Sequence, residues 1–207
     1  MSEVERTDRL IADDLRAGLG ECRLGNQLVV VEEASSTNDL AREAEARGAP
    51  EGFVVFAERQ TAGRGQYGRR WESASYQGLW FSVLLRPQIT LNESWQLTSL
   101  LASVATATII EETGCPASIK APNDIYVNGR KIAGILVEGR TARDGSYTAV
   151  AGLGVNVNQM LEDFPPELQT TAGSLRMATG RVIRRGPLAI ALLRKLENDY
   201  RAFTPVG

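Results

Sequence analysis

The chain contains no histidine in its 207 residues and only two cysteines, Cys22 and Cys115. Without histidine, it cannot carry Ser-His-Asp or Cys-His catalysis, HExxH metalloprotease chemistry or a histidine general base. The two cysteines stand in no metal-ligand spacing. So small a number argues against a disulfide scaffold and fits a reducing compartment. Any chemistry must therefore come from lysine, arginine, carboxylates, amides and the backbone.

Long apolar runs and targeting segments are absent as well. Residues 1–16 are rich in Asp, Glu and Arg, so they form neither a signal peptide nor a presequence. The most apolar stretch, residues 97–110, is interrupted by Ser and Thr and is too short to span a bilayer. We therefore expect a cytoplasmic protein with no membrane partner.

The sequence also lacks an excess of charge of one sign. Its 23 Lys and Arg against 25 Asp and Glu give a net charge of −2, so general affinity for nucleic acid is not expected. With 43% hydrophobic residues, the chain is long enough for one domain with a real core. We expect residues 1–207 to form a single domain, in which residues 1–24 are an N-terminal helical leader.

Hydrophobic periodicity and turn signals predict the order of helices and strands. The expected helices span residues 3–17, about 35–47, 93–113, 174–179 and 187–203. The expected strands span residues 27–32, 53–58, 78–86, 118–120, 124–127, 131–140 and 146–157. Gly18 and Gly20 are expected to end the first helix, while Asn128-Gly129 and Asp144-Gly145 signal hairpin turns. Because hairpins dominate the middle and helices flank them, we predict an α+β fold with a mostly antiparallel sheet.

The most informative segment is residues 58–71, with four arginines and three glycines between Arg59 and Arg70 and then Trp71. Glycine lets the backbone approach a ligand, and arginine offers planar charged forks to phosphate and carboxylate. Since no helix is expected to open directly after these glycines and no Gly-Lys-Ser/Thr follows, a Rossmann fingerprint and a P-loop are both excluded. The pattern predicts a loop that closes over a small anion. Taken alone, it is also compatible with a solvated surface loop.

A lysine and an aspartate mark the next segment. Lys131 opens an otherwise apolar run, as in a buried strand, and at such a place the ammonium can point into a site. Asp124 follows a Pro122-Asn123 turn. A hairpin with ordinary charges at its ends remains the alternative.

Two further segments carry polar groups that a ligand could use. Residues 152–158 hold two glycines and two asparagines, and glycine weakens a strand unless something must approach the backbone closely. Within that run, Asn156 can offer both a donor and an acceptor. Residues 35–38 open a helix, whose N-terminus supplies free N–H groups and hydroxyls. A β-bulge and simple N-capping are the structural alternatives.

Together, these segments resemble the catalytic domain of biotin protein ligase over roughly residues 25–205. The resemblance is carried, in order, by Ser36-Thr37-Asn38, Gln60 with Gly63-Arg64-Gly65 and Gly68-Arg69-x-Trp71, Lys120-x-Pro122-Asn123-Asp124, Lys131-x-x-Gly134-Ile135-Leu136-Val137-Glu138, and Gly154-Val155-Asn156-Val157-Asn158. It implies a fold like that of class II aminoacyl-tRNA synthetases, with a mixed, mostly antiparallel sheet flanked by helices. It also implies a reaction in which biotin and ATP, with Mg²⁺, form biotinyl-5′-AMP. The biotin then passes to a lysine on the biotin carboxyl carrier domain of acetyl-CoA carboxylase or a related carboxylase.

The resemblance further implies which residues form the site. The catalytic roles would fall to Lys131, Arg64 and Asp124, and Asp124 would either help the acceptor lysine lose its proton or bind metal. The biotin contacts would be Ser36, Thr37, Asn38, Gln60, Arg64, Gly65, Gln66, Lys131 and Gly134. The ATP or adenylate contacts would be Gly63, Arg64, Arg69, Trp71, Lys120, Asn123 and Asn156. The metal ligands are unknown.

Three departures from the family pattern stand out. Gln66 replaces the second arginine of the usual Gly-Arg-Gly-Arg loop, so a cation near the carboxylate is missing. Ala121 replaces a tryptophan, so one apolar wall of the biotin site is smaller. Bacterial members usually continue into a small β-barrel domain, whereas this sequence ends at Gly207. We also expect the loop of residues 61–70 to be mobile without biotin.

Other functions stay open. A lipoate-type ligase would share the fold and the acyl-adenylate chemistry, and a biotinyl-AMP-binding protein with weak transfer would share the site. A DNA-binding regulator is not expected, because the roughly 25 residues before the first strand are too few for a three-helix module. A homodimer through exposed sheet edges is a further implication of the resemblance.

Overall fold

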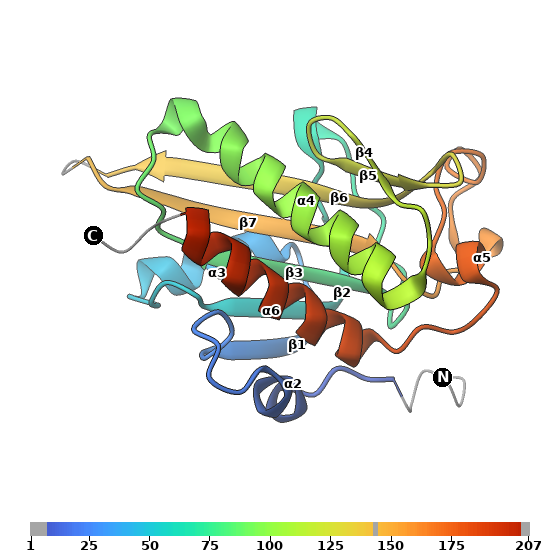
Figure 1. Cartoon of the computed structure of the whole chain (residues 1–207), viewed down its shortest axis with the longest axis horizontal. Helices are drawn as coiled ribbons and strands as arrows, with labels where there is room; N and C mark the ends of the chain where they lie inside the picture. The colour runs from blue at the N-terminus through green and yellow to red at the C-terminus, as the bar shows by residue number, and fades with distance from the viewer. Residues whose placement is uncertain (1–7, 143–144, 204–207) are drawn as a thin grey trace.

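The computed structural model describes residues 8–142 and 145–203. Over these residues, seven strands form one sheet in the order β1-β2-β3-β7-β6-β5-β4 (Figure 1). The strands are β1 Leu28–Ala34, β2 Val54–Gln60, β3 Gly78–Leu85, β4 Ser118–Lys120, β5 Asp124–Val127, β6 Arg130–Thr141 and β7 Tyr147–Asn156. Among these strands, only β1 and β2 pair in parallel. The predicted α+β fold with a mixed, mostly antiparallel sheet is confirmed.

Apart from the first, the helices lie close to their predicted positions. They are α2 Ala12–Leu19, α3 Thr37–Ala46, α4 Ser94–Thr113, α5 Leu175–Thr179 and α6 Arg185–Phe203, with short 3₁₀ turns η1 Gln66–Gly68, η2 Leu91–Glu93 and η3 Leu161–Asp163. Ser36 caps α3, because its Oγ accepts a hydrogen bond from the Asn38 N–H at 3.3 Å. Gly114, at φ 75°, ends α4 in the left-handed region. In the part of the chain that the structure describes, no helix is both long and apolar enough to cross a membrane.

The first helix was predicted too early and too long. Residues 8–11 of the predicted 3–17 helix are not helical, and residues 1–7 lie outside the described part. The reason is tertiary: the Leu10 N–H donates to Glu58 Oε1 at 2.8 Å, and the Arg185 N–H donates to Asp8 Oδ1 at 3.0 Å. These contacts hold the segment away from helical geometry. The helix also continues through Gly18 and ends only at Gly20.

Turn chemistry sets the hairpins of the sheet. Asn128 at φ 51° and Gly129 at φ 75° both take the left-handed conformation that a two-residue turn requires between β5 and β6. Gly145 at φ 84° belongs to the second predicted turn, between β6 and β7, while Asp144 lies outside the described residues. The first hairpin signal is confirmed, and it fixes the start of the strand that carries Lys131.

Helices cover the two faces of the sheet unequally. α4 and α6 lie together over one face (Figure 1), where the main core includes the stacked rings of Phe56 and Phe81, 4.8 Å apart. α3 packs on the opposite face against β2, β3 and β7, with a smaller cluster of Ala41, Val55 and Leu84. Beyond α3, the loop that joins β2 to β3 lies against this second face and brings Trp71 onto β6 and β7.

The strand register prepares that second face for a ligand. Residues that pair directly across strands point to the same side of a sheet. Two such rows run across the face under α3 and the loop: Val55-Ser82-Gly152-Leu136 and Ala57-Trp80-Gly154-Gly134. Each row contains glycine on β7, so the sheet leaves room there for side chains that come from other elements.

Candidate active site

Glycines in β6 and β7 let two side chains lie directly on the strands. A Cβ added at Gly154 would stand 2.6 Å from the Trp71 ring, and one at Gly134 would stand 2.9 Å from the same ring. A Cβ added at Gly152 would stand 2.4 Å from Asn38 Oδ1. The close approach that the glycine-rich run predicted is confirmed, and the groups that approach the backbone are Trp71 and Asn38.

A first cavity, of about 50 Å³, opens above these glycines. Its wall comes from the start of α3, the β2–β3 loop and the strands β6 and β7. The residues around it are Ser36, Thr37, Asn38, Gln60, Arg64, Gly65, Gln66, Trp71, Asn123, Lys131, Gly134, Ile135, Leu136, Gly152, Leu153 and Gly154.

A directed chain of hydrogen bonds runs beneath this cavity. The buried Ser82 hydroxyl lies 2.6 Å from Asn38 Oδ1 and 2.8 Å from Thr37 Oγ1. An amide oxygen has no proton, so Ser82 must donate to Asn38. The single hydroxyl proton of Thr37 then goes to Ser82 Oγ at 2.8 Å or to Gln60 Oε1 at 3.2 Å, while the Thr37 N–H donates to Gln60 Oε1 at 2.8 Å. This order leaves Thr37 Oγ1 with only acceptor capacity toward the cavity.

The neighbouring Ser36 has the opposite polarity. Its Oγ accepts the Asn38 N–H as the helix cap, which leaves its own O–H as a donor. The Trp71 Nε1–H is buried and has no hydrogen-bond partner among the described residues. The first cavity therefore offers both donors and acceptors, as a ligand with adjacent C=O and N–H groups requires.

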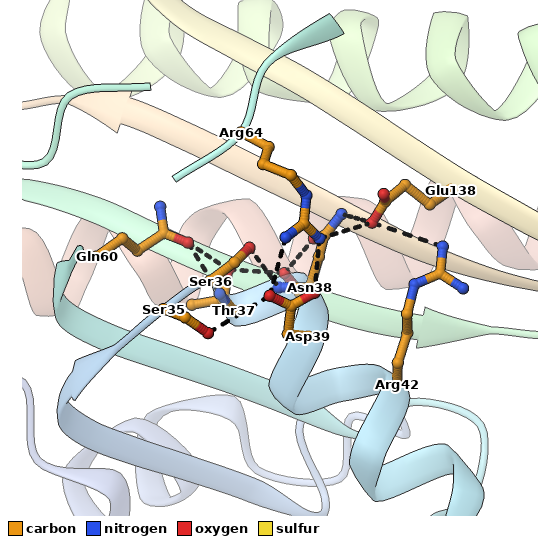
Figure 2. A network of polar contacts seen from close by, with 10 residues as sticks. Ser35, Ser36, Thr37, Asn38, Asp39, Arg42, Gln60, Arg64 and Glu138 are labelled. Carbon is orange, nitrogen blue, oxygen red and sulfur yellow. Dashed lines mark hydrogen bonds and ion pairs between the residues drawn. The ribbon is translucent and has the colours of Figure 1, made fainter. Parts of the chain in front are cut away.

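Arg64, which lines the first cavity, contacts two carboxylates, those of Asp39 and Glu138 (Figure 2). Its two terminal nitrogens donate to the two oxygens of Asp39 at 2.7 and 2.8 Å, and one of them reaches Glu138 Oε2 at 3.4 Å. Glu138 Oε2 also accepts from Asn38 Nδ2 at 2.6 Å and lies 3.6 Å from an Arg42 nitrogen. Hydrogen bonding from Arg64 lowers the pKa of Asp39, and the same contact raises the pKa of Arg64. Both groups are therefore fully ionised at neutral pH.

Lys131 stands where the first cavity meets a second one. Its side chain lines both cavities, with Nζ 2.6 Å from Asp124 Oδ1 and 5.3 Å from the centre of the Trp71 ring. Backbone bonds hold the start of its strand, since the Lys131 N–H donates to the Thr171 carbonyl at 2.8 Å. An ammonium at this junction can interact with anions that arrive from both sides.

The second cavity is larger, about 610 Å³, and cations and aromatic rings surround it. The cations are Arg69, Arg70, Lys120 and Lys131, and the rings belong to Tyr67, Trp71, Tyr126 and Phe164. Asn156 also lines it, but its Nδ2 donates to the Gly173 carbonyl at 2.9 Å and its Oδ1 accepts from Gln159 Nε2 at 3.1 Å. Its amide is thus already bound to the protein.

The structure brings together nearly all the residues that the sequence singled out. Fifteen of the sixteen line one cavity or both: Ser36, Thr37, Asn38, Gln60, Arg64, Gly65, Gln66, Arg69, Trp71, Lys120, Asn123, Asp124, Lys131, Gly134 and Asn156. Gly63 lines neither; its carbonyl accepts the Trp71 N–H at 2.9 Å and closes the base of the loop. Ala121 lines the second cavity and not the first, so the expected loss of an apolar wall concerns the second cavity.

Sequence reasoning missed three polar residues that support the site. They are Asp39, Ser82 and Glu138, none of which was given a role. Ser82 had a visible signal, because it is the polar residue within the otherwise apolar strand β3. Glu138 likewise follows the apolar run of β6. Their partners come from other elements, so the sequence could show that they were unusual but not what they bind.

Metal ligands are sparse in this site. The described residues contain no group of three His, Cys, Asp or Glu that could hold an ion. The carboxylates that line the second cavity are Asp124 and Glu72, and each is paired with a cation. Carboxylate oxygens are ligands that Mg²⁺ accepts, and Asp124 and Glu72 are the two that the second cavity offers.

Comparison with known proteins leads to the family that the sequence motifs resemble. Residues 30–156 match the family model described as Biotin/lipoate A/B protein ligase family. The "Bifunctional ligase/repressor BirA" of Bacillus subtilis is 41% identical over 209 residues, covering 98% of this chain and 64% of that protein. The "Biotin--[acetyl-CoA-carboxylase] ligase" of Mycobacterium tuberculosis is 34% identical over 206 residues, covering 92% of this chain and 73% of that protein.

A solved structure agrees in fold. The Aquifex aeolicus biotin protein ligase in complex with biotin and ATP superposes with a TM-score of 0.74 at 31% identity, covering 86% of this chain and 72% of that one. The chain spans 64% of the length of the Bacillus relative, a little under two thirds. With the family match extending over more than half of its residues, the chain belongs to the biotin/lipoate A/B protein ligase family.

Proposed function

We propose that this chain is a biotin protein ligase, which makes biotinyl-5′-AMP from biotin and ATP and passes biotin to a carrier lysine. The observation that carries the proposal is the place of Lys131 on the wall shared by the two cavities. The first cavity has the mixed donors and acceptors of a ureido site, and the second has the cations of a phosphate site. The names of the Bacillus and Mycobacterium relatives and the ligands of the Aquifex structure support this reading.

In the first cavity, biotin would lie with its ureido group against the start of α3. The Ser36 O–H would donate to the ureido carbonyl, and Thr37 Oγ1 would accept a ureido N–H. Asn38, Gln60, Gly65, Gln66 and Gly134 would line the ring and chain of biotin. The carboxylate of biotin would then extend toward Lys131.

In the second cavity, ATP would place its phosphates among the cations. Arg69 and Lys120 would meet phosphate oxygens, while Trp71 would pack near the adenine. Asn123 and Asn156 would shape this side, since both amides bind protein carbonyls, Asn123 Nδ2 to Ile135 at 3.1 Å and Asn156 Nδ2 to Gly173 at 2.9 Å. Gly63 would act through the base of the loop rather than by touching the nucleotide.

The first chemical step needs charge neutralisation rather than a base. A biotin carboxylate is already ionised at neutral pH, so its oxygen can attack the α-phosphorus directly while pyrophosphate leaves. The obstacle is repulsion between two anions, which a positioned ammonium at Lys131 reduces.

In the second step, the carrier amine attacks the acyl carbon of the mixed anhydride and AMP leaves. The amine must first lose a proton, and Asp124 is the carboxylate beside the reacting end, 2.6 Å from Lys131 Nζ. When Mg²⁺ is bound with ATP it supplies further charge neutralisation, and Asp124 and Glu72 are the residues that would hold it.

Biotin-dependent exchange of labelled pyrophosphate into ATP tests the activation step. We expect exchange with biotin and Mg²⁺, and little with lipoate in place of biotin. Faster exchange with lipoate would move the chain to the lipoate branch of its family. Absence of exchange with either acid, from folded protein, would contradict the proposal.

The proposal extends to the domain organisation, compartment, partner and oligomeric state of the chain. We propose that residues 1–207 act as one catalytic domain, in the cytoplasm, on the biotin carboxyl carrier domain of a carboxylase and without binding DNA. A homodimer through a sheet edge is part of the same proposal. A gel shift at moderate salt and sedimentation of the purified chain test the last two statements.

A further inference from the structure

The part of the β2–β3 loop that contains Arg64 is fastened to its surroundings. The Thr61 and Ala62 N–H groups donate to the carbonyls of Ala34 and Ser35, both at 2.9 Å. These two bonds attach residues 61–62 to the end of β1 and the start of α3. By contrast, Tyr67 at the tip is 90% exposed and has φ 59°. The loop therefore has an attached stem, residues 61–64, and a projecting tip, residues 65–70.

Arg64 adds a side-chain contact to these backbone bonds. Its bidentate ion pair with Asp39 and its contact with Glu138 engage both terminal nitrogens of the guanidinium (Figure 2). With Arg42 beside Glu138, two guanidinium groups face two carboxylates, so the positive charge of the set is balanced locally. An anion in the cavity would have to draw Arg64 away from both carboxylates, which costs Coulomb energy.

Given the proposed function, we propose that Arg64 is a positioning residue whose ion pair with Asp39 and Glu138 fastens the loop stem to α3, and that Lys131 supplies the charge for the reacting anions. Lys131 has a single carboxylate partner and borders both cavities. Arg64 borders only the first cavity. The proposed role of Arg64 therefore differs from the catalytic role that the family resemblance implies for it.

The ion pair also couples the start of α3 to the loop stem. Asp39 follows Ser36, Thr37 and Asn38 on α3, and Glu138 Oε2 binds both Asn38 and Arg64. The helix turn that faces the ureido group therefore holds the loop stem as well. A ligand that orders this turn stabilises the stem, and loosening the stem weakens ligand binding.

A double-mutant cycle with Asp39→Asn, Arg64→Gln and the combined variant tests the assignment. The first readout is kcat and KM for biotin in pyrophosphate exchange. The second is the rate of tryptic cleavage after Arg69 and Arg70 in the loop tip, mapped by mass spectrometry without substrates. Matched controls are Glu33→Gln and Arg59→Gln, which break a 3.1 Å ion pair between β1 and β2 outside the cavities.

We expect either single variant to raise KM for biotin about five- to tenfold, with kcat within about twofold of the parent chain. The combined variant should be no worse than the single ones. Asp39→Asn should also speed cleavage of the tip about threefold or more, while the controls change neither readout.

The assignment is overturned if Arg64→Gln lowers kcat about a hundredfold while Asp39→Asn behaves like the parent, because Arg64 would then act on the reacting groups directly. It is also overturned if Asp39→Asn leaves tip cleavage unchanged. Should the parent chain show no biotin-dependent exchange, the proposed function fails, and the cleavage measurement still decides whether Asp39 fastens the loop.

Discussion

The first and second cavities differ in how their polar groups are held. In the first, Thr37, Ser82 and Asn38 bind one another in a fixed order, and Ser82 is fully buried. In the second, the cations Arg69, Arg70 and Lys120 are exposed, and Lys120 Nζ lies 5.3 Å from the Tyr126 ring. One cavity has a prearranged hydrogen-bond pattern, whereas the other is lined by exposed cations.

The difference fits two kinds of recognition. Fixed donors and acceptors discriminate between small neutral groups, because a wrong ligand leaves buried polar atoms unpaired. Exposed cations attract a polyanion over a distance but distinguish its shape less well. Lys131 lies between these regimes, partly buried, ion-paired and on the wall of both cavities.

The largest expected effect comes from Lys131. Lys131→Met keeps the length of the side chain and removes the charge that serves both cavities. Pyrophosphate exchange should fall by about 10²–10³-fold. The variant Lys131→Met with Asp124→Asn, which leaves no unpaired carboxylate, should fall as far. Lys195→Met on α6, which removes a 3.6 Å pair with Asp199, should not. A loss under about tenfold in both Lys131 variants would contradict the statement that the charge of Lys131 serves both cavities.

A smaller effect is expected from a substitution of Gly154, which lies beneath the Trp71 ring. Gly154→Ala would put a methyl group 2.6 Å from the Trp71 ring, and this ring lines both cavities. Overpacking of about 1–3 kcal/mol should move the ring and raise KM for biotin and for ATP together. Gly186→Ala is the control, because nothing lies within 4 Å of an added Cβ there. A rise in one KM alone would show that Trp71 serves a single cavity.

Ser82→Ala should separate the two cavities. Removing this hydroxyl leaves Thr37 with Gln60 as its remaining acceptor and leaves Asn38 Oδ1 without its donor, at a cost of about 1–3 kcal/mol in stability. KM for biotin should rise about fivefold, with kcat and KM for ATP unchanged. Ser99→Ala on α4, whose hydroxyl binds the Trp95 carbonyl at 3.0 Å, is a matched control. An equal rise in KM for ATP would contradict the fixed order of hydrogen bonds.

The smallest expected effect is on acid stability. Hydrogen bonds from Arg64 lower the folded-state pKa of Asp39 below its ordinary value of 3.8. Its contribution to stability is therefore complete above pH 3.8 and is lost as the pH falls through the lower folded value. The parent chain should lose more Tm than Asp39→Asn on going from pH 6 to about pH 3. Parallel Tm curves would show that the ion pair adds nothing, as many exposed pairs do.

Much of the fold follows from local sequence. Asn128-Gly129 forced a hairpin because both positions need φ > 0, and Ser36 and Gly114 marked helix ends through capping chemistry. The prediction of the first helix was wrong for the opposite reason. Its periodicity was real, but Leu10 and Asp8 gain more from the distant Glu58 and Arg185 than from a helical turn.

The residues of the site fall into the same two groups, those that local sequence indicates and those that tertiary packing places. Residues that a ligand would touch lay in recognisable runs, such as Ser36-Thr37-Asn38 and the loop around Arg64. The residues that orient them did not, because Ser82 reaches Asn38 only through the pairing of β3 with β7 and the packing of α3. Even Arg64, correctly placed at the cavity, has carboxylate partners that no spacing in the sequence indicated.

Mass spectrometry of a carrier domain gives the most direct test of the central claim, that the cavities joined at Lys131 bring biotin and ATP together for transfer. The full chain is incubated with biotin, MgATP and a biotin carboxyl carrier domain, and the carrier is weighed and mapped. The account predicts the mass of one biotin on one lysine, lost when ATP is omitted or Lys131→Met is used. An unmodified carrier, under conditions in which pyrophosphate exchange proceeds, would contradict it.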